Sequence, residues 1–236
     1  MAVTVDIKAL LEAGVHFGHK TSRWHPKMAP YIHSKRQDSH IIDLTKTVAG
    51  LESALGFIAE TVKSGKQVLI VGTKKQAKDI VKEAAEKTGQ LYVTERWLGG
   101  MLTNVETTTG RIKHLKNLEK KMDSGELANR YSKLEVQRFQ EEIDDLNKKY
   151  SGIKDLNGKP GVVFVTDVIT DANAVREAKK LGVPVVAIVD TNADPSLIDY
   201  VIPANDDAIK GLKLIIDYVV AAIDEGKATA DKKEGK

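Results

Sequence analysis

The chain has 236 residues, of which 42% are hydrophobic, and a formal net charge of +3, so it is long enough for one large domain or one domain with an insertion. The lack of cysteine excludes disulfides and thiolate zinc sites. No apolar run approaches the roughly 20 residues that a membrane-spanning helix needs, and no export signal precedes the first predicted helix, so we expect an unexported protein.

The first elements lie within residues 6–63. We expect a short helix over residues 6–13 that Gly14 ends, because glycine tolerates the left-handed backbone that often follows a helix. The runs YIHS from Tyr31 and HIIDL from His40 are predicted to pair as a hairpin around the polar KRQD turn. Another helix is predicted over residues 45–63.

Short β-branched apolar runs then recur, each typical of a strand buried on both faces. Residues 73–87, 172–181 and 206–225 have helical patterns, and Gly182 ends the second of these. Strands that alternate with helices predict an α/β fold, a Rossmann-like or flavodoxin-like layered parallel sheet with helices on both faces. The predicted strands are VLIVG (68–72), LYVT (91–94), VVFVT (162–166), VVAIVD (185–190) and YVIP (200–203).

Residues 105–153 interrupt this alternation. From Val136 to Ile153, apolar residues recur at steps of 3 and 4, the seam of a coiled coil, and Ser132 with Glu135 forms a capping box. Because Asp123, Ser124 and Gly125 allow the chain to double back, we predict an inserted antiparallel coiled-coil hairpin that protrudes. The alternative is an ordinary pair of helices lying on the sheet. The expected organisation is a globular α/β domain (1–104 and 154–226), the hairpin (105–153) and a disordered charged tail (227–236).

The glycine-rich stretches do not match nucleotide-binding fingerprints. Gly72-Thr73-Lys74-Lys75 lacks both GxGxxG and GxxxxGK[ST], which leaves either a generic phosphate receptor at a helix N-terminus or a plain turn with solvated lysines. Gly99-Gly100 is expected to allow close backbone packing or to hinge the helical arm. No GxSxG elbow is present for nucleophilic catalysis.

Carboxylates are predicted to meet at one edge of the sheet. Asp190 ends a strand, while Asp206 and Asp207 follow the next strand and open a helix, so parallel neighbours would bring all three together. Their repulsion favours a divalent cation, zinc or magnesium, with His19 as the first histidine candidate and His16 as the second. The alternatives are Asp206 as a helix N-cap, with Asp207 stabilised by the helix dipole, and Asp190 as a turn former.

Residues 13–37 contain no Asp or Glu, in a chain that is 29% charged. Lys and Arg are interleaved there with Phe17, Trp24 and Tyr31, a composition that suits RNA because cations neutralise phosphates and aromatic rings stack on unpaired bases. Phe17 and Trp24 could equally belong to the core. The cluster Glu95-Arg96-Trp97 follows a strand and could extend the same face.

These segments resemble the S-two family of bacterial small-subunit ribosomal proteins, in order and from the first helix to about Gly226. The family's HFGH run falls on residues 16–19, RWLGG on 96–100, DTN on 190–192 and NDD on 205–207, while the tail lies outside the match. The segments are LLEAGVHFGHKTSRWHPKM, HIIDLTKT, VGTKKQA, RWLGGMLTN, GIKDL, PGVVFVTDVITDANAVREAKKLGVP and AIVDTNADP with IDYVIPANDDAI; within them Val168-Ile169-Thr170 falls where other members vary.

The resemblance implies an α/β domain with a protruding arm, a seat between the head and body of the small subunit, and contacts with its rRNA. It also implies docking of the large mRNA-binding first protein of that subunit, a bacterial cytoplasmic location, no required cofactor and no enzymatic activity. The candidate rRNA-binding residues are Lys20, Arg23, Trp24, His25, Lys27, Lys35, Arg36, Lys74, Lys75 and Arg96.

Two other functions stay open at this point. One is a Rossmann-like enzyme that takes a nucleotide or sugar phosphate in a pocket lined by Thr73, Lys74, Thr166 and Asp190. The other is a free-standing RNA regulator, which would differ from the ribosomal hypothesis only in its partner.

Overall fold

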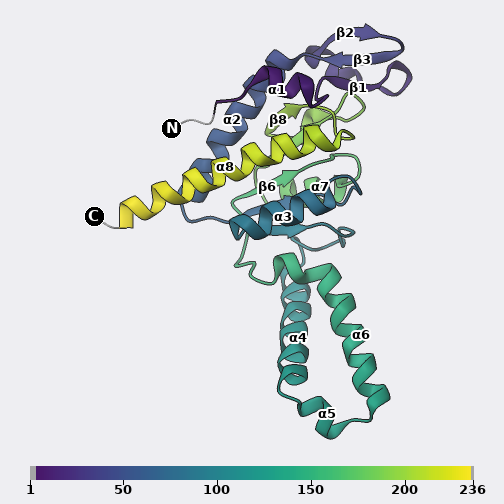
Figure 1. The fold of residues 1–236 in the computed structure, drawn as a ribbon, viewed down its shortest axis with the longest axis vertical. Helices are drawn as coiled ribbons and strands as arrows, with labels where there is room; N and C mark the ends of the chain where they lie inside the picture. Colours follow the sequence, from purple (N-terminus) through teal and green to yellow (C-terminus); the bar gives the residue numbers. More distant parts are fainter. Residues whose placement is uncertain (1–3, 235–236) are drawn as a thin grey trace.

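The computed structural model describes residues 4–234, with side chains as far as residue 230. A small three-stranded sheet lies at one end of the long axis, a five-stranded sheet with its helices occupies the middle, and a helical arm projects from the other end (Figure 1). Within the described residues, no helix is long and apolar enough to cross a membrane.

The large sheet is parallel, with strand order β5-β4-β6-β7-β8. If these five strands are numbered 1 to 5 along the chain, their order in the sheet is 2-1-3-4-5, which is the flavodoxin-like order. The direction of winding reverses between β4 and β6. Leu69 pairs with Leu91 on one side and with Val163 on the other. All five predicted strands are confirmed: β4 (Val68–Val71), β5 (Leu91–Val93), β6 (Val162–Val165), β7 (Val185–Val189) and β8 (Tyr200–Pro203).

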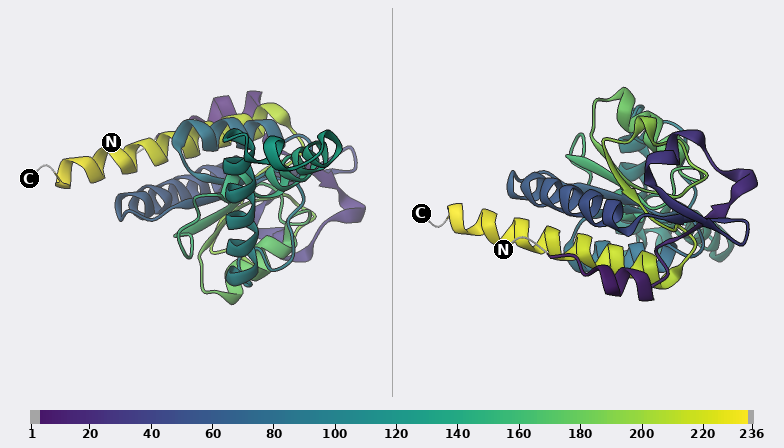
Figure 2. Two further views of the ribbon diagram at one scale, coloured as in Figure 1. Left: turned by 90° about the horizontal axis from the view of Figure 1, so that it is seen from below. Right: turned by 90° about the horizontal axis from the view of Figure 1, so that it is seen from above.

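Helices cover both faces of this sheet (Figure 2). Successive strand residues point to opposite faces, so Ile70 and Phe164 pack on one side while Leu69 and Val163 pack on the other. The first face is covered by α1 (Ile7–Glu12), α2 (Leu44–Lys63), α3 (Lys78–Thr88) and α8 (Ile209–Glu234). The second is covered by α7 (Ala172–Lys180) and by the chain that leads into the arm. The predicted layered α/β fold is therefore confirmed.

The small sheet contains the predicted hairpin. β2 (Ile32–Arg36) pairs antiparallel with β3 (Ser39–Ile42), and Gln37 and Asp38 between them have φ of 46° and 63°. Two successive positive φ values are the geometry of a type I′ turn, which fits the twist of a two-residue hairpin. β1 (Phe17–Lys20) adds a third strand beside β3, which the sequence analysis did not predict. Two 3-10 turns, η1 (Thr21–Arg23) and η2 (Pro26–Tyr31), connect β1 to β2.

The arm consists of α4 (Val105–Asp123), α5 (Glu126–Arg130) and α6 (Lys133–Tyr150), followed by the turn η3 (Ser151–Ile153). The capping box of Ser132 and Glu135 is present at the start of α6. A small apolar cluster joins α4 and α6 through Leu115, Leu118, Ile143 and Leu146. The helices lie side by side near the sheet and diverge towards α5 (Figure 1). A protruding helical hairpin is thus present, and coiled-coil packing along its length stays a prediction.

Three segment boundaries differ from expectation. α3 begins at Lys78 rather than at residue 73, because the N–H and hydroxyl of Thr73 donate to the carboxylate of Asp171 instead of joining a helix. α8 begins at Ile209 rather than at residue 206.

α8 also continues to Glu234 through most of the expected disordered tail. Ala-rich and Lys-rich sequence has high helix propensity, and Lys227 anchors this stretch by donating to the carbonyl oxygen of Thr88. Residues 235–236 of the predicted tail lie outside the described residues.

Candidate nucleic-acid interface

The small sheet sits on the edge where the strands of the large sheet end. The His19 amide donates to the hydroxyl of Thr191 at 2.9 Å, and the His25 amide donates to the Thr191 carbonyl oxygen at 2.7 Å. Thr191 is the second residue after β7. A Cβ built on Gly18 would come within 2.6 Å of the Thr191 methyl group, so a residue without a side chain is required for this close approach. The N-terminal stretch is therefore fixed to the edge that also carries Lys75 and Arg96.

Several predicted RNA-binding cations are exposed at this edge. In the part of the chain whose side chains are described, no carboxylate oxygen lies within 4.0 Å of their charged nitrogens. An open pocket borders two of them, with Gly18, His19 and Asp207 in its wall. These cations are Lys20, Arg23, Arg36, Lys75 and Arg96, and the first two line the pocket.

Two aromatic side chains of the stretch are also exposed. Trp24 is 39% exposed, and its ring centroid lies 5.2 Å from that of His40. Phe17 is 51% exposed and packs against His16. The core interpretation of these two aromatics is therefore wrong, and both rings are available for contact.

Other predicted cations lie beside acids, most of them beside Asp194, which is distant in the sequence. Lys27 Nζ lies 3.1 Å from Asp194 Oδ2 and donates to Ser196 Oγ at 2.6 Å, while His25 Nε2 lies 3.9 Å from Asp194. Hydrogen bonds from Ser196, together with Lys27, hold the pKa of Asp194 well below its usual range. Lys35 has a longer contact, 3.9 Å, with Asp38. Residues 13–37 thus contain no acid in their sequence, but the fold brings acids from other segments close to some of their cations.

Lys74 differs most from its prediction. Its ammonium group lies 2.8 Å from carboxylate oxygens of both Asp206 and Asp207 and 3.3 Å from Asp167, and its side chain is only 18% exposed. Burial alone would lower the pKa of Lys74, but hydrogen bonds to Asp206 and Asp207 raise it above its ordinary value. Lys74 therefore serves as a counter-ion at the sheet edge, and its contact with RNA stays a prediction.

The predicted metal ligands do come together. Ligand atoms of His19, Asp206 and Asp207 lie within 4.8 Å of one another, and His19 Nδ1 lies 3.1 Å from Asp190 Oδ2. The hydrogen bond to Asp190 raises the pKa of His19, and burial raises the pKa of Asp206 to about 7, with Asp167 and Asp190 adding to the effect. Imidazole nitrogen and carboxylate oxygen are donors that suit zinc, and the oxygens also suit magnesium.

The second histidine candidate and the alternative roles of the acids can also be placed. His16 is not among the grouped ligands; burial lowers its pKa, and its buried Nδ1 has no partner among the described residues. Asp206 is not an N-cap, because the first α8 hydrogen bond runs from Leu212 to the Ala208 carbonyl. Asp190 does form a turn, since the Ala193 amide donates to the Asp190 carbonyl oxygen at 3.1 Å.

The crevice that an enzyme of this fold would use is filled by the protein itself. Ligands of such sheets bind where the winding reverses, here beyond the ends of β4 and β6. At that point Thr73 is bound to Asp171, Lys74 is held by three carboxylates, and Thr166 and Asp190 are 1% and 0% exposed. Two residues of the predicted enzyme pocket, Thr166 and Asp190, are therefore buried, and the other two are bound by carboxylates of the protein itself.

Three acids at or near this edge were not predicted. Asp167 and Asp171 follow β6, and applying to β6 the strand-end argument that identified Asp190 would have found Asp167. Glu177 on α7 binds the loop before the arm, and no spacing in the sequence indicates it.

Comparison with known proteins resolves the family. The family described as Ribosomal protein S2 matches residues 10–226. The chain belongs to the ribosomal protein S2 family. "Small ribosomal subunit protein uS2" of Roseiflexus sp. (strain RS-1) is 52% identical over 94% of this chain and 85% of its own length. The proteins of the same name from Chloroflexus aggregans and Coprothermobacter proteolyticus are 51% and 50% identical, over 94% and 96% of this chain and 93% and 84% of their own lengths.

Membership of the S2 family confirms the resemblance inferred from the motifs. Proteins of the S2 family are structural components and not enzymes, so the nucleotide or sugar-phosphate enzyme is excluded on the ground of family. The match also covers both sheets and the arm; it begins within α1 and ends within α8.

Proposed function

We propose that this chain, a structural constituent of the small subunit of the bacterial cytoplasmic ribosome, binds small-subunit rRNA at the junction of head and body. The observation that carries the proposal is the group of exposed, unpaired cations at the carboxyl edge of the sheet, described above. Phosphate neutralisation by Lys and Arg releases counterions and supplies most of the affinity for a nucleic-acid backbone. The exposed ring of Trp24 adds a stacking surface for an unpaired base.

Charge reversal at the pocket tests this proposal. Arg23→Glu and Lys20→Glu should each weaken binding to small-subunit rRNA and reduce the salt dependence of log K by roughly 0.7 to 0.9 per lost phosphate contact. Lys66→Glu is the matched control, because Lys66 is exposed and lies two residues before β4, at the opposite ends of the strands. Circular dichroism should stay unchanged in all three variants. Equal effects of Lys66→Glu and Arg23→Glu, or a salt slope that Arg23→Glu does not alter, would contradict the proposal.

We propose that the docking face for the mRNA-binding first protein lies on α1 and the start of β1. Ile7 and Leu11 are 43% and 52% exposed and share one side of α1, since they are four residues apart. Phe17 is exposed as well, close to Gly14 at the end of α1. Adjoining exposed apolar side chains of this kind favour a protein partner over RNA.

Leu11→Asp should reduce retention of the first protein on purified small subunits without altering incorporation of this chain. Leu197→Asp is the control, because Leu197 is 46% exposed but lies in the turn η4 (Pro195–Leu197) on a different surface. Unaltered retention with Leu11→Asp would refute this location.

We further propose that His19, Asp190, Asp206 and Asp207 can hold a divalent cation, zinc or magnesium, which the protein does not require as a cofactor. Three carboxylates, those of Asp167, Asp206 and Asp207, lie within 4.0 Å of the single ammonium group of Lys74, and Asp190 adds a fourth beside His19, so acids outnumber the ammonium group. A cation would have to displace the Lys74 ammonium group from Asp206 and Asp207. Elemental analysis should find metal in the purified protein and less in Asp190→Ala and Asp207→Asn; no stoichiometric metal means no site.

A further inference from the structure

The loop that connects β5 to the arm is held by one carboxylate. Glu177 Oε1 accepts hydrogen bonds from Trp97 Nε1 at 3.0 Å and from the Gly100 amide at 2.8 Å. Its Oε2 accepts from the amides of Leu102 and Thr103 at 3.0 and 3.1 Å and from the Thr103 hydroxyl at 3.1 Å. Five donors from a stretch of seven residues thus converge on a side chain of α7, at least 74 positions away in the sequence.

The charge of Glu177 is balanced by these dipoles. In the part of the chain whose side chains are described, no Lys, Arg or His nitrogen lies within 4.0 Å of its carboxylate, and the neighbouring Arg176 bonds instead to Asn173. Burial alone would raise the pKa of Glu177, but the hydrogen bonds from Trp97 and from the backbone of the loop lower it. Converging amides form an anion-binding nest, and bonds to a charged acceptor are roughly twice as strong as neutral ones.

The backbone of the loop is shaped for this contact. Gly100 has φ of +88°, a conformation that other residues rarely adopt, and this turn directs its amide towards Glu177. The Asn104 amide donates to the Gly100 carbonyl at 2.8 Å, and the Asn104 side chain caps α4. The nest therefore ends where the first helix of the arm begins. This agrees with the expectation that the paired glycines serve close packing or the hinge of the arm.

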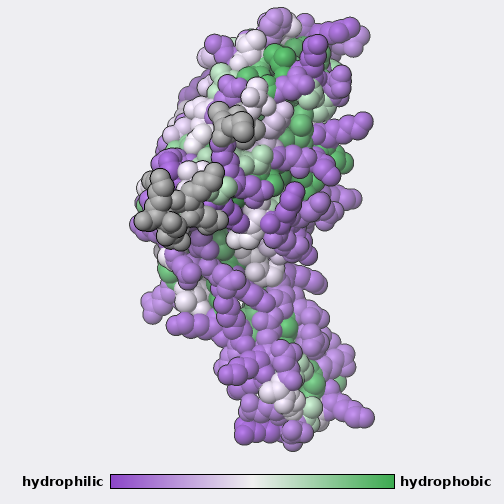
Figure 3. Space-filling view, turned by 60° about the vertical axis from the view of Figure 1, so that its left-hand side comes forward, coloured by the Kyte–Doolittle hydropathy of each residue, from purple (hydrophilic) through white to green (hydrophobic). Residues whose placement is uncertain are grey.

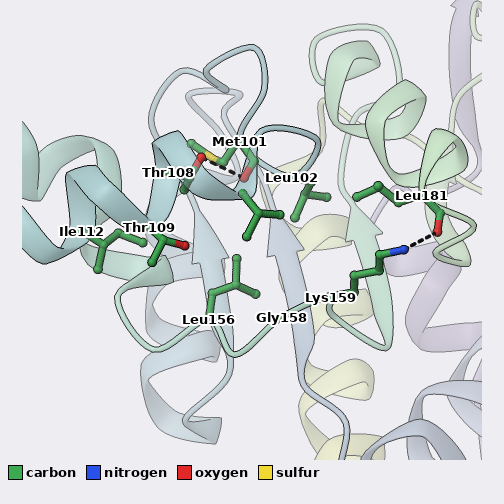
Figure 4. A pocket seen from close by; sticks show the side chains of 10 residues that line it. Met101, Leu102, Thr108, Thr109, Ile112, Leu156, Gly158, Lys159 and Leu181 are labelled. Atoms are coloured by element: carbon green, nitrogen blue, oxygen red, sulfur yellow. Dashed lines mark hydrogen bonds between the residues drawn. The ribbon is translucent and has the colours of Figure 1, made fainter.

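The other side of the loop is fixed by apolar packing. Met101 and Leu102 line a small pocket with Ile112 of α4, Leu156 and Leu181, the residue that follows α7 (Figure 4). The Thr108 hydroxyl donates to the Met101 carbonyl at 3.2 Å across the start of α4 (Figure 4). Hydrogen bonds to Glu177 and packing beside Leu181 thus tie the root of the arm to the same helix.

The other end of the arm is joined to the sheet domain as well, where Ile153 is buried in the second core and Gly152 packs closely against Tyr92 of β5. The surface of the arm is mostly hydrophilic on the face shown in Figure 3, and it extends away from the sheet domain (Figure 1). A small rotation where the arm joins the sheet domain becomes a large displacement at α5. The arm can therefore hold its side chains in one position only if this junction is rigid.

We propose that Glu177 is a positioning residue that fixes the loop at the α4 end of the arm, so that the arm reaches its contacts in the small subunit in one orientation. The second half of this statement rests on the proposed function. The first half concerns the free protein and can be tested without ribosomes.

The test measures local opening of the loop in the intact chain. In Glu177→Ala, hydrogen exchange at the amides of Gly100, Leu102 and Thr103 should accelerate at least about tenfold, while exchange in β4 and β6 should stay unchanged. Glu177→Gln keeps one acceptor oxygen and should give an intermediate effect, and it serves if the alanine variant fails to fold. The indole N–H resonance of Trp97 should shift in both variants. Unaccelerated exchange at these amides would overturn the proposal.

The controls distinguish a local effect of the clamp, meaning the hydrogen bonds that Glu177 accepts from the loop, from a general loss of stability. Glu142→Gln removes a paired surface carboxylate of the arm, which accepts from His114, and should leave the loop amides unaffected. Incorporation of Glu177→Ala into small subunits should fall below that of Glu142→Gln. Faster exchange with unaltered incorporation would refute a role for the clamp in docking. If the wild-type chain itself fails to enter subunits, the proposed function fails, and the exchange data still decide the clamp.

Discussion

Replacing Lys74 with methionine should destabilise the protein strongly. The substitution keeps the length and apolar character of the side chain and removes only the charge, so that Asp167 and Asp206, which are 5% and 4% exposed, lose their counter-ion. Breaking a buried ion cluster by removing one partner costs about 3–5 kcal/mol, because the remaining charges stay desolvated and repel each other. For a chain of this size that corresponds to a decrease in Tm of roughly 6–20 °C.

Urea and thermal unfolding at pH 7.5 with a chelator present measure this loss, since the chelator prevents a metal ion from replacing the ammonium group. Lys75→Met is the matched control: Lys75 is adjacent but exposed, and its replacement should change the free energy of unfolding by less than about 0.5 kcal/mol. Adding Asp206→Asn to the Lys74→Met variant should restore part of the stability, with a coupling of about 1–3 kcal/mol, because one uncompensated charge is removed.

A destabilisation by Lys74→Met no larger than that of Lys75→Met would refute the reasoning. So would a double variant in which the two effects simply add. Either result would mean that water, rather than Lys74, compensates the carboxylates at this edge.

Three further outcomes are expected. Gly18→Ala should lower the free energy of unfolding by about 1–3 kcal/mol and reduce the affinity for rRNA, because the added Cβ would collide with Thr191 and displace the N-terminal sheet. A variant with the melting temperature and rRNA affinity of the wild type would contradict this close approach. Glu177 has a lowered pKa, so its contribution to stability is present above the ordinary carboxyl pKa and is lost as the pH falls through its pKa in the folded state. The stability of Glu177→Gln should therefore depend less steeply on pH in the acid range than that of the wild type. An identical loss of stability in acid would count against the hydrogen bonds to Glu177. Burial raises the pKa of Asp171 to about 6, so the folded state binds the proton more tightly and stability is lost as the pH rises from about 4 to about 6. The urea midpoint of Asp171→Asn, which retains an acceptor for Thr73, should not show this decline. A decline equal to that of the wild type would exclude Asp171 as its source.

The sequence by itself determined the layered fold. The strands β4, β6 and β7 are short β-branched runs in which every residue is buried, and each run predicts its strand without knowledge of its neighbours. The capping box at Ser132 and the apolar steps along α6 likewise depend on residues within a few positions of one another. Gly14 and Gly182 end their helices for a local reason, a backbone conformation with positive φ. Patterns of this kind can be predicted from the sequence because they depend only on residues that are close together in the chain.

Only the tertiary structure decided which charges are free. Lys74 and Lys75 are neighbours in the sequence, yet one is buried among carboxylates from two other strand ends and the other is exposed. Lys27 lies in a stretch without acids, and it is neutralised by Asp194, 167 positions away.

Glu177 illustrates the same limit, because its five donors follow a different strand of the sheet. Composition and spacing fix how many donors and acceptors a chain carries. Which of them meet depends on the order of the strands and on where each loop lies, and burial then determines whether a charge serves the protein's own structure or a partner.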